Sequence, residues 1–243
     1  MSIACVLAAV ALPAAVFAQA GQPGPLTGLA SLTPSFPRRE AAPSSLPRHL
    51  TEKWHQNIVT TVFWVGEPSV GAGWSACKDS AWDPRWVENY GGPDHPTKRK
   101  GFLPAAFKPK QNPFYVALPF NDLVPKTRAN PVISNFLRFW RRSVIGSFRN
   151  SKSVCKNQWI AIRFGDKVVH AQWQDVGPVN FDDYDYVFGF QRPKSTAQGM
   201  AGLDVSPAVR DFLGIPGRGT TDWRFVDETE VPRGPWKDIV TRD

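Results

Sequence analysis

The stretch that decides the fold reads HAQWQDVGPVNFDDYDYVFG over residues 170–189 and continues, after a short spacer, as AGLDVSPAVRDFLGI over residues 201–215. Its first part begins as an apolar and polar alternation typical of a strand. The strand then meets an Asp-x-Gly-Pro turn formed by Asp175, Gly177 and Pro178. Asp, Gly and Pro each favour turns for a separate steric or hydrogen-bonding reason, so we expect the strand to end here.

The second part of the stretch predicts a strand that runs directly into a short helix. Asp204 and Ser206 form an Asp-x-Ser sequence at the end of the strand. Ser is a preferred N-cap residue, and Pro207 suits the first helical position because it has no N–H to satisfy. Gly214 follows Leu213 and suits the left-handed conformation that ends many helices.

These motifs resemble the double-psi β-barrel family, which includes rare lipoprotein A, expansins and barwin. The resemblance rests on the Asp-x-Gly-Pro turn, the Asp-x-Ser strand and the Leu-Gly-Ile sequence that ends the helix. It covers His170 to Val226 and extends more weakly back through VALPF at residues 116–120. It implies a mainly β fold: a six-stranded double-psi β-barrel with one short helix after the Asp-x-Ser strand.

The rest of the chain agrees with a barrel of short strands. Runs rich in β-branched and aromatic residues, with few breakers, predict strands. Gly165 and Asp166 lie between two of these runs and indicate a tight hairpin. The predicted strands are residues 57–65, 114–120, 159–164, 167–174 and 222–226.

Two segments are expected to elaborate the barrel. Residues 66–96 are dense in Trp, Gly, Asp and Pro and predict a long loop. Residues 131–149 carry apolar side chains at helical spacing, flanked by Arg, and predict an inserted amphipathic helix. This helix either packs on the barrel or meets an anionic polymer or lipid.

The N-terminal region is expected to direct export. Ile3–Phe17 is an apolar run that is short for a membrane span and is typical of a signal peptide, here residues 1–18. Residues 19–50 read as a Pro-rich linker. Residues 51–243 then form a single domain, with the family resemblance best over 111–236. A secreted, periplasmic or extracellular protein without stable membrane insertion is expected, and the rival interpretation is an uncleaved anchor.

The charge distribution indicates an anionic partner. The chain has a net charge of +8, and the stretch 97–163 holds 14 Lys and Arg residues against one acid, Asp122. Outside the cell, cell-wall polysaccharide or another anionic glycan is the expected partner of such a stretch. Nucleic acid is not expected in that setting. The protein is expected to be a monomer.

Cysteine usage predicts one disulfide and no metal site. After removal of residues 1–18, Cys77 and Cys155 remain, and an even count in an oxidising compartment indicates that they are bonded. Two buried thiols are the alternative. No cysteine spacing matches a zinc or iron–sulfur site, so neither a metal nor another cofactor is expected.

Asp204 and Asp175 are the candidate catalytic residues that the resemblance implies. Cleavage of a glycan needs an acid to protonate the glycosidic oxygen, and hydrolysis needs a second carboxylate. Each aspartate also has a structural alternative, because Asp204 precedes a helix N-terminus and Asp175 begins a turn. The chain departs from the wall-cleaving members of the family before VALPF, where Pro113, Phe114 and Tyr115 replace a His.

Aromatic side chains are the candidate contacts to sugar rings. The chain has 10 Trp, more than a barrel of this size requires in its core. Flat aromatic faces stack on sugars. The candidate substrate-binding residues are Trp74, Trp82, Trp86, Trp173 and Tyr184.

Two functions follow from these features. The first is a wall-polysaccharide protein that binds or remodels glycan without a complete catalytic set. The alternative is a lytic transglycosylase or glycoside hydrolase that acts on peptidoglycan or another polysaccharide through Asp204 and Asp175. The sequence leaves open whether the protein is an enzyme.

Overall fold

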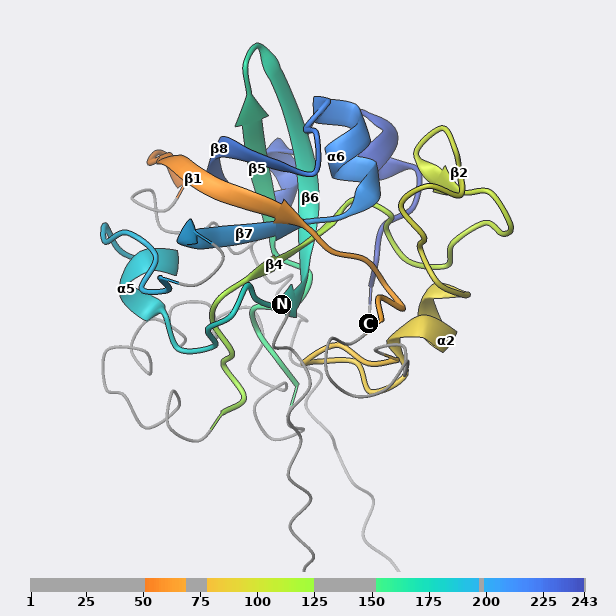
Figure 1. Cartoon of the computed structure of the whole chain (residues 1–243), viewed down its shortest axis with the longest axis horizontal. Helices are drawn as coiled ribbons and strands as arrows, with labels where there is room; N and C mark the ends of the chain where they lie inside the picture. Colours follow the sequence, from red (N-terminus) through yellow and green to blue (C-terminus); the bar gives the residue numbers. More distant parts are fainter. Residues whose placement is uncertain (1–50, 69–77, 125–151, 197–198, 243) are drawn as a thin grey trace, which may run out of the picture.

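Six strands close into a barrel in the computed structural model, in the order β1-β7-β4-β6-β5-β8 (Figure 1). The structure describes residues 51–68, 78–124, 152–196 and 199–242. The barrel strands are β1 (His55–Val62), β4 (Tyr115–Leu118), β5 (Trp159–Phe164), β6 (Lys167–Val176), β7 (Ala201–Val205) and β8 (Arg218–Val226).

The barrel mixes parallel and antiparallel pairs. β1 runs parallel to β7 and β4 runs parallel to β6, while the other four neighbouring pairs are antiparallel. A parallel pair needs a long connection between its strands, so neither pair is formed by strands that are consecutive in the chain. This closed, mixed, mainly β arrangement confirms the predicted fold class and is consistent with a double-psi barrel.

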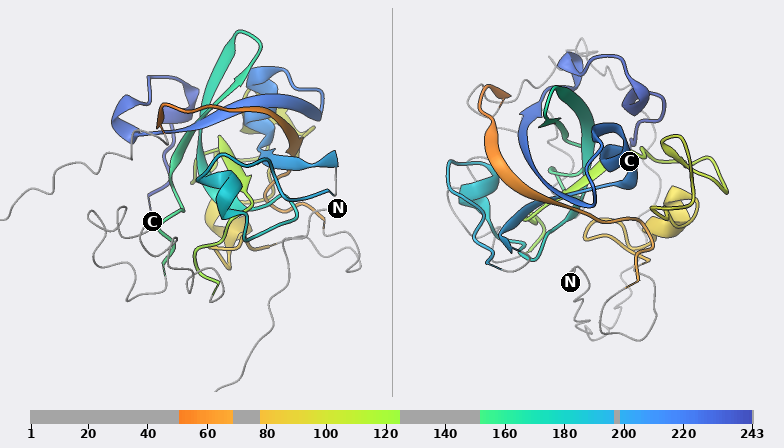
Figure 2. Two further views of the ribbon diagram at one scale, coloured as in Figure 1. Left: turned by 90° about the vertical axis from the view of Figure 1, so that its left-hand side faces the viewer. Right: turned by 45° about the horizontal axis from the view of Figure 1, so that its top comes forward.

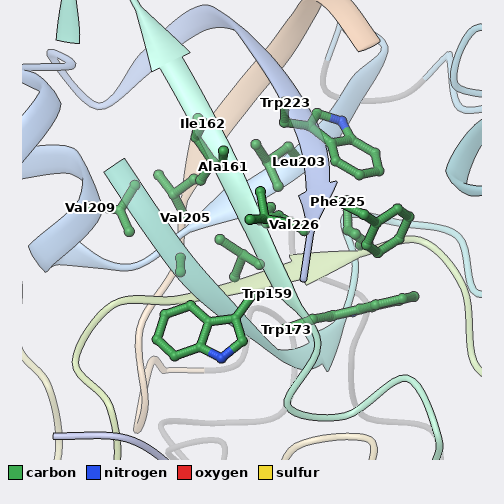
Figure 3. Close-up of a cluster of buried hydrophobic side chains, with 14 of the residues drawn as sticks. Trp159, Ala161, Ile162, Trp173, Leu203, Val205, Val209, Trp223, Phe225 and Val226 are labelled. Carbon is green, nitrogen blue, oxygen red and sulfur yellow. The ribbon is translucent and has the colours of Figure 1, made fainter. Parts of the chain in front are cut away.

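The barrel core is built by strand alternation. Side chains of successive strand residues point to opposite faces, so every second residue enters the barrel. Trp173, Trp223 and Phe225 are fully buried there, together with Ile162 and Leu203 (Figure 3).

The hairpin of β5 and β6 and the helix α6 (Pro207–Leu213) form as predicted. Phe164 pairs with Lys167 across a turn in which Gly165 has a φ of 57°. Ser206 caps α6 by accepting a hydrogen bond from the Val209 N–H at 3.3 Å. Gly214 ends it at a φ of 80°, where a residue with a Cβ would be strained.

The first and last strands differ from the predicted ranges because they pair with each other. β1 begins at His55, whose ring stacks on Trp223 with centroids 4.1 Å apart. Asn57 adopts a φ of 53° at a bulge, and its N–H donates to the Asp222 carboxylate at 2.9 Å. β8 begins at Arg218, earlier than predicted, and so provides the partner for β1.

The predicted loop 66–96 is partly helical where it is described. It contains α2 (Trp86–Tyr90) and leads into a two-stranded sheet of β2 (Arg99–Lys100) and β3 (Leu103–Pro104). These elements lie together on one side of the barrel, and α5 (Tyr184–Val187) lies on the other (Figure 2).

A buried polar network attaches this elaboration to the barrel. Tyr115 of β4 donates its hydroxyl hydrogen to Asp94 at 3.0 Å and accepts one from the Val65 N–H at 3.0 Å. Asp94 also forms a buried ion pair with Arg99. The rings of Trp86 and Tyr115 meet edge to face, 5.3 Å apart. The network therefore fixes α2 over the outer face of β4.

The C-terminal segment also packs on the barrel. It contains the short 3₁₀ helices η3 (Glu228–Glu230) and η4 (Pro235–Lys237). The Gln172 amide oxygen accepts from the Thr241 N–H at 2.9 Å and from Asn112 at 3.0 Å. The Gln172 side chain thus attaches the segment around Thr241 to strand β6.

Several predicted features lie outside the described residues: the signal peptide, the linker, and the helix at residues 131–149. Within the described ranges, no helix combines the length and apolar character needed to cross a membrane.

Candidate functional site

The two candidate aspartates lie on either side of one residue of β4. Ala117 pairs with Asp175 on β6 and with Asp204 on β7. Neighbouring strands are about 4.8 Å apart, so the two backbones are separated by about 10 Å. Leu203 and Val205 point into the core, and Asp204 between them therefore points outward. The fold thus brings both predicted residues to one outer face of the barrel.

Asp204 is a buried acid that lies close to Gly177. The Thr61 hydroxyl donates a hydrogen bond to its Oδ1 atom. Its Oδ2 atom faces Gly177, where an added Cβ would lie only 3.4 Å away. The residue is 5% exposed, and burial raises the pKa of its carboxyl to about 6. The residues next to this carboxyl, Gly177 and Ala117, are therefore both small.

Asp175 holds the Trp-containing loop against the barrel. Its Oδ1 atom accepts hydrogen bonds from the Ala81 N–H and the Val176 N–H, each at 2.8 Å. Burial raises the pKa of its carboxyl to about 7, the two hydrogen bonds oppose this, and the charges of Asp204 and Asp79 add to it. These contacts give Asp175 a structural role in addition to its place in the site.

Glu67 is a third carboxyl, whose charge interacts with that of Asp204, and no sequence pattern predicted it. It follows the end of β1 in a turn where its N–H donates to the Trp64 carbonyl at 3.0 Å. Burial, and then the charge of Asp204, raises the pKa of its side chain to about 7. No motif marks a glutamate after Gly66, so only the fold shows its relation to Asp204.

The chemistry of this face is that of a carboxyl group whose pKa has been raised towards neutral pH. A general acid works best when its pKa lies close to the working pH, and burial is the usual means of raising a carboxyl to that range. Asp204 meets this condition and has one hydrogen bond at its carboxyl, whereas Asp175 has two from the backbone. Asp204 is therefore the better candidate for proton transfer.

Two predicted sugar-stacking residues are inside the protein. Trp86 is 4% exposed and packs against Phe63 and Tyr115, because α2 turns its apolar face to β4. Trp173 is fully buried in the barrel, and its indole N–H donates to the Asp175 carbonyl at 2.7 Å. Neither ring presents a face to a ligand, which corrects the expectation for both residues.

Trp82 and Tyr184 are half-buried. Trp82 is next in sequence to Ala81, whose N–H donates to Asp175, so Trp82 lies beside the site. Its indole N–H donates to the Asn121 side-chain oxygen at 3.2 Å. Tyr184 packs on Phe188 at the start of α5, with ring centroids 5.3 Å apart. Trp74 lies outside the described residues. Trp82 is thus the described tryptophan best placed to contact a ligand at the aspartates.

The structure does not support the expected disulfide. Cys155 is a fully buried free thiol, and burial raises its pKa. Cys77 lies outside the described residues. Over the described ranges, no group of three or more His, Cys, Asp or Glu side chains is arranged to hold a metal ion.

Comparisons with known proteins add a weak structural likeness. No family model matches the chain, and no curated protein matches it. Among solved structures, the chain is similar to a Streptomyces papain inhibitor, with 11% sequence identity and a TM-score of 0.30. The alignment covers 72% of this chain and 96% of the inhibitor. A likeness at this level carries no argument about function.

Proposed function

We propose that the protein is exported and remodels cell-wall polysaccharide at the outer face of β4, β6 and β7, with Asp204 as the proton donor. The observation that supports this most is the position of Asp204, a buried carboxyl with a pKa of about 6 that lies next to the small residues Gly177 and Ala117. The resemblance of the Asp-x-Gly-Pro and Asp-x-Ser motifs to wall-active double-psi barrels supports the substrate class.

The arrangement favours cleavage by a single acid. Asp204 would protonate the glycosidic oxygen as the bond to the anomeric carbon breaks. In hydrolysis a second carboxylate activates water or attacks the sugar. Asp175 has its Oδ1 atom engaged by two backbone N–H groups, so it is poorly suited to that task. A lytic transglycosylase needs no second carboxylate, because a hydroxyl of the substrate itself attacks the anomeric carbon and the carboxylate left on Asp204 accepts the proton of that hydroxyl.

Binding without cleavage is the second candidate function. It is favoured by the burial of Asp175 and Asp204, each only 5% exposed, which restricts the access of a substrate to their carboxyls. In that case Trp82 and the basic side chains supply the contacts to an anionic wall polymer, and the two aspartates serve the fold. The proposal for export, with cleavage of the signal peptide after Ala18, is common to both functions.

One experiment separates the two functions. The purified protein is incubated with peptidoglycan and, separately, with cellulose, and both the sedimented protein and the soluble fragments are measured. Transglycosylation releases fragments that end in an internal anhydro ring without a new reducing end, whereas hydrolysis creates reducing ends. If the protein sediments with either polymer but releases no fragments, we would conclude that it binds the polymer without cleaving it.

A further inference from the structure

A cleft lies on a different face of the barrel from Asp204. It has a volume of about 640 Å³, which is within the range of sites for small organic ligands. The strand order places β8 and β5 away from β4 and β7, with β6 or β1 between them. The cleft is lined by Thr51, Glu52, Trp54, Arg224 and Glu230.

Arg224 is the cation of this cleft. Its Nη1 group donates to the Thr51 carbonyl, but its buried Nε–H has no acceptor in the part of the chain that the structure describes. Among the described residues it forms no ion pair, whereas the neighbouring Arg163 pairs with Asp222 at 2.6 Å. An arginine N–H can only donate, and a buried donor without an acceptor is costly. Because Arg224 lines the cleft, the positive charge of its guanidinium is available to an anionic ligand there.

Two more buried nitrogen atoms, one on β5 and one on β6, lack hydrogen-bond partners among the described residues. Ala161 of β5 pairs with His170 on one side and with Arg224 on the other, so their side chains flank a small residue. His170 is 7% exposed and its Nδ1 atom has no partner, and Trp159 is 2% exposed with an unpartnered indole N–H. Burial, then the charges of Arg224 and Lys237, lowers the pKa of His170 to about 4.

An indole ring and two carboxylates also line the cleft. The Trp54 ring lies against Arg224 and Arg163, with guanidinium carbons 5.2 Å and 4.7 Å from it. Arginines packed on an indole hold the ring in place. Glu52 and Glu230 line the cleft without pairing to Arg224, and carboxylates accept hydrogen bonds from hydroxyl groups. A ligand that matches the residues lining the cleft carries an anion, an apolar face and several hydroxyls.

We propose that this cleft binds an acidic sugar residue, with the sugar carboxylate on Arg224, its hydroxyls on Glu52 and Glu230, and its ring on Trp54. The proposal deepens the proposed function, on which it rests only for the class of polymer: the cleft would hold one sugar of an acidic chain at a distance from Asp204. Binding of a single sugar can be measured whether or not the protein cleaves a polymer.

The test is calorimetric titration with methyl glucuronide, methyl glucoside and acetate. We expect methyl glucuronide to bind at least about tenfold more tightly than either of the others. Only this ligand can form both the charged hydrogen bond to Arg224 and the ring contact with Trp54. Arg224→Gln should weaken binding of the glucuronide at least about tenfold, and Glu230→Gln, an exposed and mild change, should weaken it several-fold. Asp204→Asn should bind the glucuronide as the wild type does.

Arg242→Gln is the matched control, because Arg242 is an exposed arginine near the same segment and pairs with Glu228. It should leave binding unchanged. If methyl glucoside bound as tightly as methyl glucuronide, the proposed role of the carboxylate would be wrong. If acetate bound as tightly, the result would mean an adventitious ion only and no sugar site. Unchanged binding in folded Arg224→Gln protein would place the sugar elsewhere. A failure of cleavage with intact glucuronide binding would count against the proposed function alone.

Discussion

Asp204→Asn should stabilise the protein at alkaline pH. Burial raises the pKa of this carboxyl from 3.8 to about 6. At about 1.4 kcal/mol for each tenfold change in proton affinity, the ionised form is disfavoured by about 3 kcal/mol in the folded state. Asn is uncharged and still offers an oxygen to the Thr61 hydroxyl. We therefore expect a gain of about 1–3 kcal/mol in the free energy of unfolding at pH 8.

The sign of the pH dependence follows from the same values. Below pH 3.8 the carboxyl is neutral in both states. Between pH 3.8 and about 6 the unfolded chain loses the proton first, so the folded state binds more protons and stability falls as pH rises. Above about pH 6 the carboxyl is ionised in both states, and its effect on the free energy of unfolding no longer changes with pH.

Urea unfolding of the wild type and of Asp204→Asn at pH 4 and pH 8 measures this difference. The two proteins should be similar at pH 4 and differ at pH 8. Equal stabilities at both pH values would refute the argument that Asp204 is desolvated at the cost of stability. Asp166→Asn, at the exposed tip of the β5–β6 hairpin, is the matched control and should change neither value.

Three further predictions concern the attachments of the fold and the charge of the surface. Tyr115→Phe removes the hydroxyl that joins Asp94 and Val65, and should cost about 1–3 kcal/mol in urea unfolding; a loss below about 0.5 kcal/mol would mean that the network contributes little. Gln172→Leu releases the hydrogen bonds to Thr241, so limited proteolysis should cut residues 228–242 faster than in the wild type, and an unchanged digestion pattern would contradict this role. Binding to anionic wall polymer should weaken as salt rises, because surface charges are screened within about 10 Å at 0.1 M; salt-independent sedimentation would exclude the basic residues as the contact.

Features set by local chemistry could be predicted from the sequence. Ser206, Pro207 and Gly214 define the ends of α6 through capping and backbone preferences that act within a few residues. Gly165 does the same for the β5–β6 hairpin. The closeness of Asp175 and Asp204 depends on pairing with β4, and it could be expected only from the resemblance to a known barrel.

Features set by tertiary packing could not be predicted in this way. Trp86 lies in a polar, Gly-rich sequence, yet it is buried because α2 packs on Tyr115. The two-residue strands β2 and β3 are too short to leave a periodic pattern. Glu67 has no sequence signal, because its raised pKa arises from burial and from a residue 137 positions away, at Asp204.

The most direct test of the central claim is the release of soluble fragments from peptidoglycan by the wild type, Asp204→Asn and Asp166→Asn at pH 6. If Asp204 donates the proton, its replacement should lower the rate about 10²–10⁴-fold while circular dichroism shows a folded protein, and Asp166→Asn should keep the wild-type rate. Full activity of a folded Asp204→Asn variant would contradict the assignment of Asp204 as the proton donor.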